Sequence, residues 1–162
     1  MSRIQLALNV ANLDESIEFY SKLFQTQPSK IREGYANFSI ANPPLKLILF
    51  TGMGQPGSLN HVGVEVETTD EVAATIARVE TLGIEQEIQE NVSCCFAVQD
   101  KTWIKGPDND WEFYTVLADA PTMSCASDAN SSGWSDTNTT EAADSLAPVT
   151  ATATEIARSQ CC

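Results

Sequence analysis

The chain contains an internal repeat that spans most of its first 120 residues. A shift of 56 positions lays QLALNVANLDESI, which starts at Gln5, over HVGVEVETTDEVA, which starts at His61. In both copies a capping residue, Asn12 or Thr68, stands three residues before a glutamate, the spacing of a capping box at a helix start. A shift of 58 then lays YANFSIAN over SCCFAVQD. The repeat therefore predicts two similar modules in one chain.

Each module is predicted to be a strand, a helix and then about three strands. The last strands are LKLILF in the first module and WEFYTVL in the second. In the opening strands, IQLALNV and HVGVEV, alternation separates an apolar face from a face of small and polar residues. The apolar faces suit packing against the helices, and the opposite faces suit the wall of a cavity. The fold class is thus α+β, with two tandem βαβββ modules.

The composition changes near residue 120. We expect one domain over residues 1–120, with module one at about 1–52 and module two at about 58–118. Residues 121–162 are rich in Ser, Thr, Ala and Asp and poor in large aliphatic side chains, so they cannot bury enough apolar surface to order themselves. We expect a low-complexity, disordered tail there. Its cysteines, Cys125, Cys161 and Cys162, are either incidental or catch soft ligands such as arsenicals and pass them inward.

Charge limits the partners of this protein. The 22 acidic and nine basic side chains give a net charge of −13, which repels both nucleic acid and anionic membranes. The N-terminus lacks the layout of a signal peptide, and no apolar run approaches the length of a membrane helix. We therefore expect a cytoplasmic protein, in which the cysteines are mostly reduced thiols.

Three residues stand out as candidate metal ligands. His61 is the only histidine in the chain, and the repeat makes Gln5 its counterpart. Glu112 is a lone carboxylate in the aromatic strand DWEFYTV, where it needs a partner to offset desolvation. An imidazole, an amide oxygen and a carboxylate suit Fe(II), Mn(II), Ni(II) or Zn(II). The alternative is that all three are structural: a strand-end histidine, a solvated glutamine and a surface carboxylate.

The tandem modules, with a histidine opening the second and WEFY closing it, resemble the vicinal oxygen chelate superfamily. That superfamily includes glyoxalases, extradiol dioxygenases and bleomycin-binding proteins. The resemblance implies a cupped mixed sheet holding one divalent metal on Gln5, His61 and Glu112. The usual oxygen-activating iron site has two histidines and one carboxylate, so the glutamine leaves Fe(II), Ni, Co, Zn and Mn open. LKLILF offers no fourth donor, which argues against a glyoxalase-type site with two carboxylates.

The segments RIQLALNV, YANFSIANPPLKLILF, CCFAVQDKTWIKGP and WEFYTVLAD resemble a narrower group, the ArsI-type carbon–arsenic lyases, also known as cadmium-induced proteins. This resemblance implies an Fe(II)-dependent dioxygenase, an oxidoreductase of arsenic detoxification. Its substrates would be dioxygen and trivalent organoarsenicals, namely methylarsenite and aromatic arsenicals, and its product inorganic arsenite. Cys94 and Cys95 match the pair that holds the arsenic. The sequence leaves a monomer and a homodimer equally open.

The cysteine pair has a geometric consequence. Trivalent arsenic is soft and pairs with thiolate, and an arsenical with one carbon substituent has two exchangeable positions for a dithiol. Adjacent side chains in a regular strand diverge, so a clamp requires the pair to leave strand geometry. We expect a mobile loop at about residues 88–95 that closes over the metal. Trp103 and Lys105 are candidate contacts for an aromatic substrate, or ordinary packing and surface residues.

Other interpretations remain open at this stage. The cysteines suit small buried hydrophobes or a vicinal disulfide acting as a redox switch. The protein would then be a glyoxalase-like isomerase or an extradiol-type dioxygenase on the same fold. A protein that binds arsenicals or soft metals without turnover is the third possibility.

Overall fold

Residues 1–123 of the chain are described by a computed structural model. Residues 124–162 of the predicted tail, with its three cysteines, lie outside them. The first module contains β1 (Arg3–Asn9), α1 (Leu13–Phe24), β2 (Lys30–Arg32), β3 (Tyr35–Ile40) and β4 (Leu45–Phe50). The second contains β5 (Leu59–Glu65), α2 (Thr69–Thr81), β6 (Gln86–Cys94), β7 (Ala97–Ile104) and β8 (Trp111–Asp119). The predicted order of two βαβββ modules is confirmed. Within residues 1–123, no helix is both long and apolar enough to cross a membrane.

Both helices begin where the repeat places them. The side chain of Asn12 accepts a hydrogen bond from the backbone N–H of Glu15, 3.2 Å away, at the start of α1. At the start of α2, Thr68 and Glu71 form a complete capping box. These contacts satisfy backbone donors that a helix start leaves without a partner. Asn12 and Thr68, which are equivalent in the repeat, therefore both cap the start of a helix.

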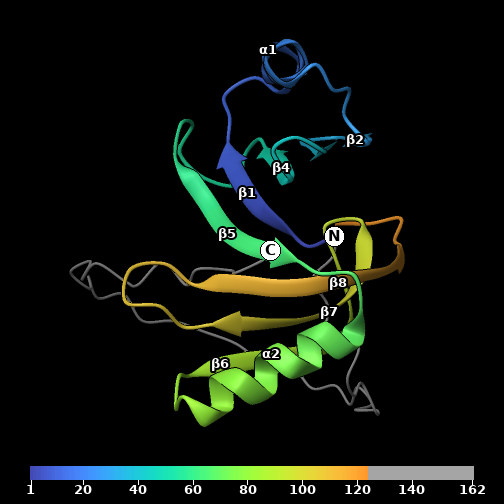
Figure 1. Ribbon diagram of the computed structural model, residues 1–162. Helices are drawn as coiled ribbons and strands as arrows, with labels where there is room; N and C mark the ends of the chain where they lie inside the picture. Colours follow the sequence, from blue (N-terminus) through green and yellow to red (C-terminus); the bar gives the residue numbers. More distant parts are fainter. Residues whose placement is uncertain (124–162) are drawn as a thin grey trace, which may run out of the picture.

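The eight strands form one curled mixed sheet in the order β2-β3-β4-β1-β5-β8-β7-β6 (Figure 1). Within each module the first strand pairs in parallel with the last one, β1 with β4 and β5 with β8. The modules meet where β1 and β5 pair antiparallel. Read outward from this junction, the two halves of the sheet have the same order of strands. The repeat in the sequence is thus an approximate twofold repeat in the structure.

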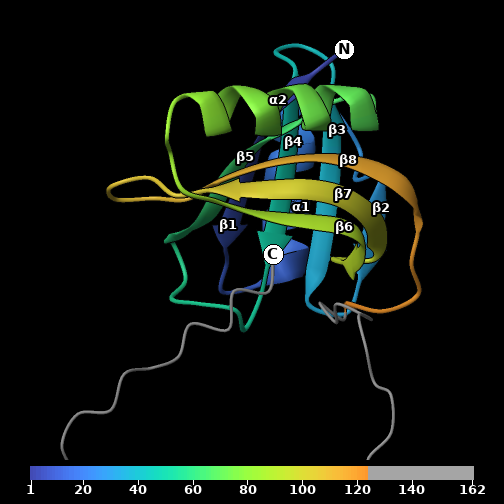
Figure 2. The ribbon, with the colours of Figure 1, turned by 90° about the horizontal axis from the view of Figure 1, so that it is seen from below.

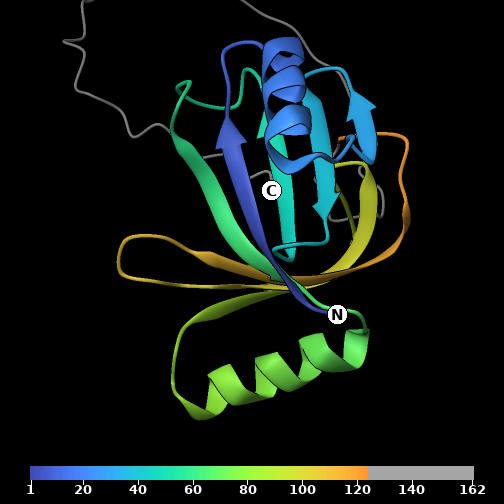
Figure 3. The same cartoon turned by 45° about the horizontal axis from the view of Figure 1, so that its top comes forward.

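The two faces of the sheet are used differently. Helix α1 packs on β3 and β4 (Figure 3), and α2 lies along β7 and β8 (Figure 2), both on the convex face. Beneath α1 lies an apolar core made of Ala36, Phe38, Ile40, Leu47 and Leu49. On the concave face, the alternate residues of β1 are also buried, namely Gln5, Ala7 and Asn9. The polar face predicted for the opening strands therefore points into the curl of the sheet.

The expected loop at residues 88–95 is wrong, while the expected departure of the cysteine pair from strand geometry is confirmed. Strand β6 runs through Cys94 with an irregularity between Gln89 and Val92, and β7 starts only at Ala97. Cys95 and Phe96 form a two-residue hairpin turn with φ angles of 51° and 62°. Such a turn requires positive φ at both central residues. The pair leaves strand geometry through this turn alone, so a longer loop is not needed.

Candidate metal and substrate site

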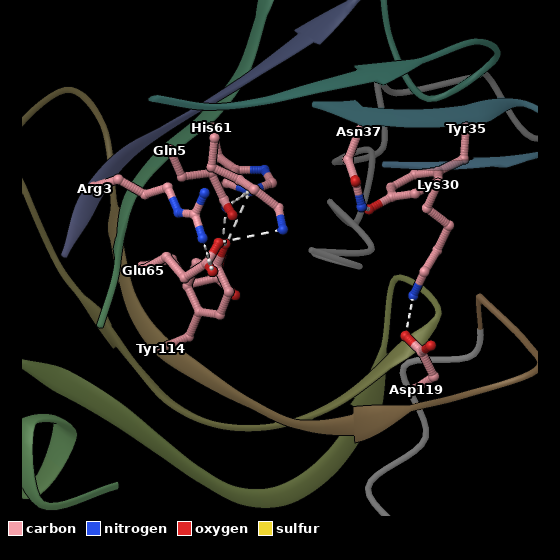
Figure 4. Close-up of polar contacts among 11 residues, drawn as sticks. Arg3, Gln5, Lys30, Tyr35, Asn37, His61, Glu65, Tyr114 and Asp119 are labelled. Carbon is pink, nitrogen blue, oxygen red and sulfur yellow. Dashed lines mark hydrogen bonds and ion pairs between the residues drawn. The ribbon is translucent and has the colours of Figure 1, made fainter. Parts of the chain in front are cut away.

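Gln5 of β1, His61 of β5 and Glu112 of β8 come together on the concave face. Figure 4 shows Gln5 beside His61. The Nε2 atom of Gln5 lies 2.7 Å from Nε2 of His61 and donates to Oε2 of Glu112, also at 2.7 Å. His61 Nε2 and Glu112 Oε2 are 3.6 Å apart. All three side chains are buried. The structure thus brings together the three residues that the sequence singled out as ligands.

The three groups fit a divalent metal ion by distance and by chemistry. Donor atoms bound to one metal at about 2.0–2.2 Å lie at most about 4.4 Å apart, and every separation here is shorter. Turning the Gln5 amide about its last side-chain bond presents its oxygen in place of its nitrogen. Within residues 1–123 no group of three His, Cys, Asp or Glu side chains could hold a metal. The set of Gln5, His61 and Glu112 therefore depends on the Gln5 amide as its third donor.

Glu112 is held as a carboxylate by a lysine that the sequence analysis missed. Lys101 on β7 is 2% exposed, and its Nζ donates to Glu112 Oε1 at 3.0 Å. Burial raises the pKa of Glu112, but the ammonium of Lys101 and the neighbouring His61 outweigh burial and lower that pKa to about 2. Oε1 faces Lys101, so Oε2 is the oxygen left for a metal. The available signal was that Lys101 alternates with Gln99 and Trp103 along one strand face.

A chain of hydrogen bonds orients the His61 ring. Its Nδ1 lies 2.8 Å from the side-chain oxygen of Asn60, an atom that can only accept, so Nδ1 carries the proton and Nε2 carries the lone pair. Asn60 in turn donates to Asn9 at 3.0 Å, and Asn9 donates to Ser58 at 2.9 Å. This arrangement leaves Nε2 in the form that binds a metal.

Replacing Asn60 with alanine removes the acceptor for Nδ1 while leaving every candidate ligand in place. We expect Asn60→Ala to weaken divalent metal binding about 10- to 100-fold, the usual effect of losing such an orienting contact. Competition with a fluorescent chelator measures the affinity. Ser58→Ala, which changes only the far end of the same chain of bonds, is the matched control and should have a much smaller effect. Equal affinities for Asn60→Ala and the wild type would contradict this role.

A glycine allows β5 to approach β8 at the site. Gly63 pairs with Glu112, and a Cβ atom at Gly63 would lie 2.6 Å from the Glu112 backbone oxygen. In the first module, the counterpart of this pair is Ala7 with Ile48 opposite it, and the Ile48 side chain carries no donor atom. Lys46, two residues earlier on β4, pairs with Glu65 at 3.3 Å. The donor set is therefore asymmetric, although the sheet is nearly symmetric.

The cysteine pair lies in a packed cluster on the same concave face. The two Sγ atoms are 3.7 Å apart, far longer than an S–S bond of about 2.05 Å, so they are not bonded to each other. Neither cysteine is a free thiol in this structure, so the expected reduced form is not the one described. Sulfur atoms that share one bound atom at about 2.3 Å can lie up to about 4.6 Å apart, and this separation falls within that limit. The other buried members of the cluster are Ala7, Tyr35, Ile48, Phe50 and Phe96.

Strand β2 of the first module holds the cysteine turn of the second. Lys30 donates to the backbone oxygen of Phe96 at 2.9 Å and forms an ion pair with Asp119 at the end of β8 (Figure 4). The Arg32 guanidinium lies 5.9 Å from the centre of the Phe96 ring, and the Tyr35 ring lies 5.2 Å from it. Sequence patterns did not indicate this contact, because β2 and the turn are more than sixty residues apart.

Aromatic rings connect the turn with the ligand set. The ring of Phe50, a member of the cysteine cluster, lies 6.4 Å from the His61 ring. On the other side, Trp103 lies edge-on to His61 at 5.5 Å and is buried, as expected of a residue near the site. Lys105 instead pairs with Asp110 at 2.8 Å, and that hydrogen bond raises the pKa of its ammonium. Trp103 therefore belongs to the site, and Lys105 serves the connection between β7 and β8.

Comparison with known proteins gives the family. Residues 3–113 match the family described as the Glyoxalase/Bleomycin resistance protein/Dioxygenase superfamily. This chain belongs to that superfamily. Two solved structures share its fold: an extradiol ring-cleaving dioxygenase from B. fuscum (TM-score 0.52, 20% identity, covering 73% of this chain and 33% of that one) and an Mn(II)-bound glyoxalase from Novosphingobium aromaticivorans (TM-score 0.51, 16% identity, covering 78% and 44%).

Much more similar members of the superfamily are found among curated proteins. The cadmium-induced protein CadI of Mycobacterium tuberculosis is 53% identical over 124 residues, which cover 76% of this chain and 82% of CadI. The trivalent organoarsenical cleaving enzyme of Thermomonospora curvata is 50% identical over 131 residues, which cover 80% and 87%. Both alignments span most of each protein. This member of the superfamily is thus similar, over nearly the whole described chain, to proteins named for cadmium induction and for organoarsenical cleavage.

Proposed function

We propose that this protein cleaves the carbon–arsenic bond of trivalent organoarsenicals in an Fe(II)-dependent reaction with dioxygen that yields inorganic arsenite. One observation carries the proposal: the Cys94–Cys95 turn and the Gln5–His61–Glu112 set lie on the same concave face, linked through Phe50. The 50% identical relative named a trivalent organoarsenical cleaving enzyme supports the reaction class. The superfamily supports a metal-dependent enzyme.

The cysteines bind the arsenic by exchange. A trivalent arsenical with one carbon group carries two hydroxyl groups. In the reduced protein, each thiol replaces one of them as a sulfur–arsenic bond forms and water leaves. The arsenic then has two sulfur ligands and its carbon. Because the turn is fixed at the edge of the concave face, the carbon group is directed toward the buried ligand set. Holding the reacting bond in one orientation is the main contribution of the protein.

Gln5, His61 and Glu112 would hold the metal, through the amide oxygen, Nε2 and Oε2. Bound Fe(II) would supply the redox chemistry with dioxygen that amino-acid side chains lack. The buried rings around the cysteines exclude water from the path between turn and ligand set. Burial raises the pKa of Tyr35 in this cluster to about 12, so its hydroxyl stays neutral at physiological pH. Lys101 keeps Glu112 charged.

A panel of substrates tests this proposal against its rivals. The protein loaded with Fe(II) is incubated in air with methylarsenite, with a hemithioacetal for glyoxalase activity, or with a catechol for extradiol cleavage. We expect inorganic arsenite from the first and no product from the other two. Turnover of the hemithioacetal or the catechol would favour a glyoxalase-like or extradiol enzyme. Stoichiometric arsenical binding without product would favour a binding protein, which the relatives named for cadmium induction leave as the second candidate.

The contact between β2 and the turn has a consequence for substrate binding. Lys30→Met keeps the aliphatic stem and removes the ammonium that holds the Phe96 carbonyl. We expect the affinity for methylarsenite to fall about tenfold, the effect of one lost charge-assisted hydrogen bond, with metal affinity unchanged. Equilibrium dialysis with arsenic counted by mass spectrometry measures it. Asp119→Asn, which preserves the contact between Lys30 and Phe96, should lose less methylarsenite affinity. Wild-type affinity in Lys30→Met would contradict the role of Lys30 in holding the turn.

A further inference from the structure

Two buried amide oxygens on the concave face have no hydrogen-bond partner within the described residues. They are Oδ1 of Asn37 and Oε1 of Gln99. The two residues are only 5% and 6% exposed. A buried carbonyl without a partner costs free energy that a bound donor would recover. Two such oxygens on one face therefore indicate a ligand that brings its own donors.

Asn37 lies beside the cysteine turn. Its Nδ2 donates to the hydroxyl of Tyr35 at 2.7 Å, and the Tyr35 ring packs against that of Phe96 in the turn at 5.2 Å. Asn37 also lies in the same cross-strand row as His61, separated from it by β4 and β1. Figure 4 shows Asn37 and Tyr35 to the right of Gln5 and His61. The unpartnered oxygen thus belongs to the region between turn and ligand set.

Gln99 reaches the same region from the second module. Along β7 it alternates with Lys101 and Trp103, which contact Glu112 and His61 on the concave face. The intervening Asp100 points the other way and accepts a hydrogen bond from Thr69 of α2. Gln99 therefore lies on the concave face, along β7 between the cysteine turn and Lys101. The two oxygens come from the two modules, one on each side of the proposed path of the substrate.

We propose that Asn37 and Gln99 select organoarsenicals whose organic group carries N–H or O–H donors, such as aminophenyl or hydroxyphenyl arsenites. This inference rests on the proposed function, because it assumes that the cysteine pair holds the arsenic. An alkyl or unsubstituted phenyl group leaves both oxygens without a partner. A donor-bearing ring satisfies them, and a ring that offers only acceptors does not.

Equilibrium dialysis of the reduced, metal-free protein tests this selectivity without any turnover. The probes are phenylarsenite, 3-amino-4-hydroxyphenylarsenite, which carries two donors, and 4-nitrophenylarsenite, which carries acceptors only. We expect the donor-bearing compound to bind at least about tenfold more tightly than phenylarsenite, and the nitro compound no more tightly. The readout is the dissociation constant of phenylarsenite divided by that of the donor-bearing compound. A general loss of folded protein affects both constants equally and cancels in this ratio.

Substitutions assign the selectivity to the two residues. Asn37→Leu and Gln99→Met should each bring the ratio toward one, Gln99→Glu should retain it because an oxygen acceptor remains, and Gln27→Met at an exposed glutamine should match the wild type. Equal binding of all three probes by the wild type overturns the inference, and so does failure of the donor-bearing probe to bind. If the ratio is as expected but Fe(II) and air give no arsenite from any probe, the proposed function fails while the selectivity stands.

Discussion

Replacing Cys94 or Cys95 with serine is expected to lower the affinity for methylarsenite at least about 100-fold and to abolish its cleavage. With two thiols, the second sulfur–arsenic bond forms within one complex at a high effective concentration, and this advantage disappears when one thiol is lost. The measurement is equilibrium dialysis of the reduced protein, followed by arsenic speciation after incubation with Fe(II) in air.

Metal binding separates this effect from damage to the fold. Because neither cysteine is one of the proposed metal ligands, both variants should bind divalent metal as the wild type does. Cys125→Ser, outside the described residues, is the matched control and should retain affinity and cleavage. A Cys95→Ser variant that still cleaves methylarsenite would remove the cysteine pair from the account and leave only the metal site.

Replacing Glu112 with glutamine is expected to have two large effects. It removes the only carboxylate of the ligand set, so divalent metal affinity should fall at least about 100-fold. It also leaves the buried ammonium of Lys101 without its counter-charge, and breaking a buried pair in this way costs about 3–5 kcal/mol. The free energy of unfolding of the metal-free protein should therefore decrease by about that amount in urea denaturation at pH 7.

The double variant Lys101→Met/Glu112→Gln distinguishes the two effects. Without the ammonium, no buried charge remains, so most of the lost stability should return while metal binding stays weak. The wild type adds a test by pH: because the pKa of Glu112 is lowered to about 2, its stabilising charge is fully present above about pH 4.5 and is lost as pH falls toward 2. A double variant as unstable as Glu112→Gln would contradict the proposed ion pair.

The fold followed from the sequence because its strongest signal was a repeat. A shift that places Gln5 over His61 and Asn12 over Thr68 fixed the order of strands and both helix starts without knowledge of any contact. Two of the three candidate ligands were found in the same way, since Gln5 and His61 occupy equivalent strands. Glu112 was visible because a lone carboxylate in an aromatic strand requires a partner.

The residues that the sequence did not reveal act through contacts between strands. Lys101 looked like an ordinary strand lysine, because its contact with Glu112 depends on the register in which β7 pairs with β8. Lys30 reaches Phe96 from the other module. The loop predicted for residues 88–95 was wrong because two positive φ angles, at Cys95 and Phe96, turn the chain more tightly than sequence composition indicates. Local sequence patterns predicted the helices and strands, while the pairing of strands determines which further side chains reach the candidate site.

The most direct measurement is the number of inorganic arsenite molecules released per protein chain. The protein is reduced, loaded with Fe(II), and incubated in air with a large excess of methylarsenite, and the arsenic species are separated and counted over time. We expect many arsenite molecules per chain in air, and none above background when air is replaced by nitrogen. Release of no arsenite, with one methylarsenite retained per chain, would contradict it and leave a binding protein on the same fold.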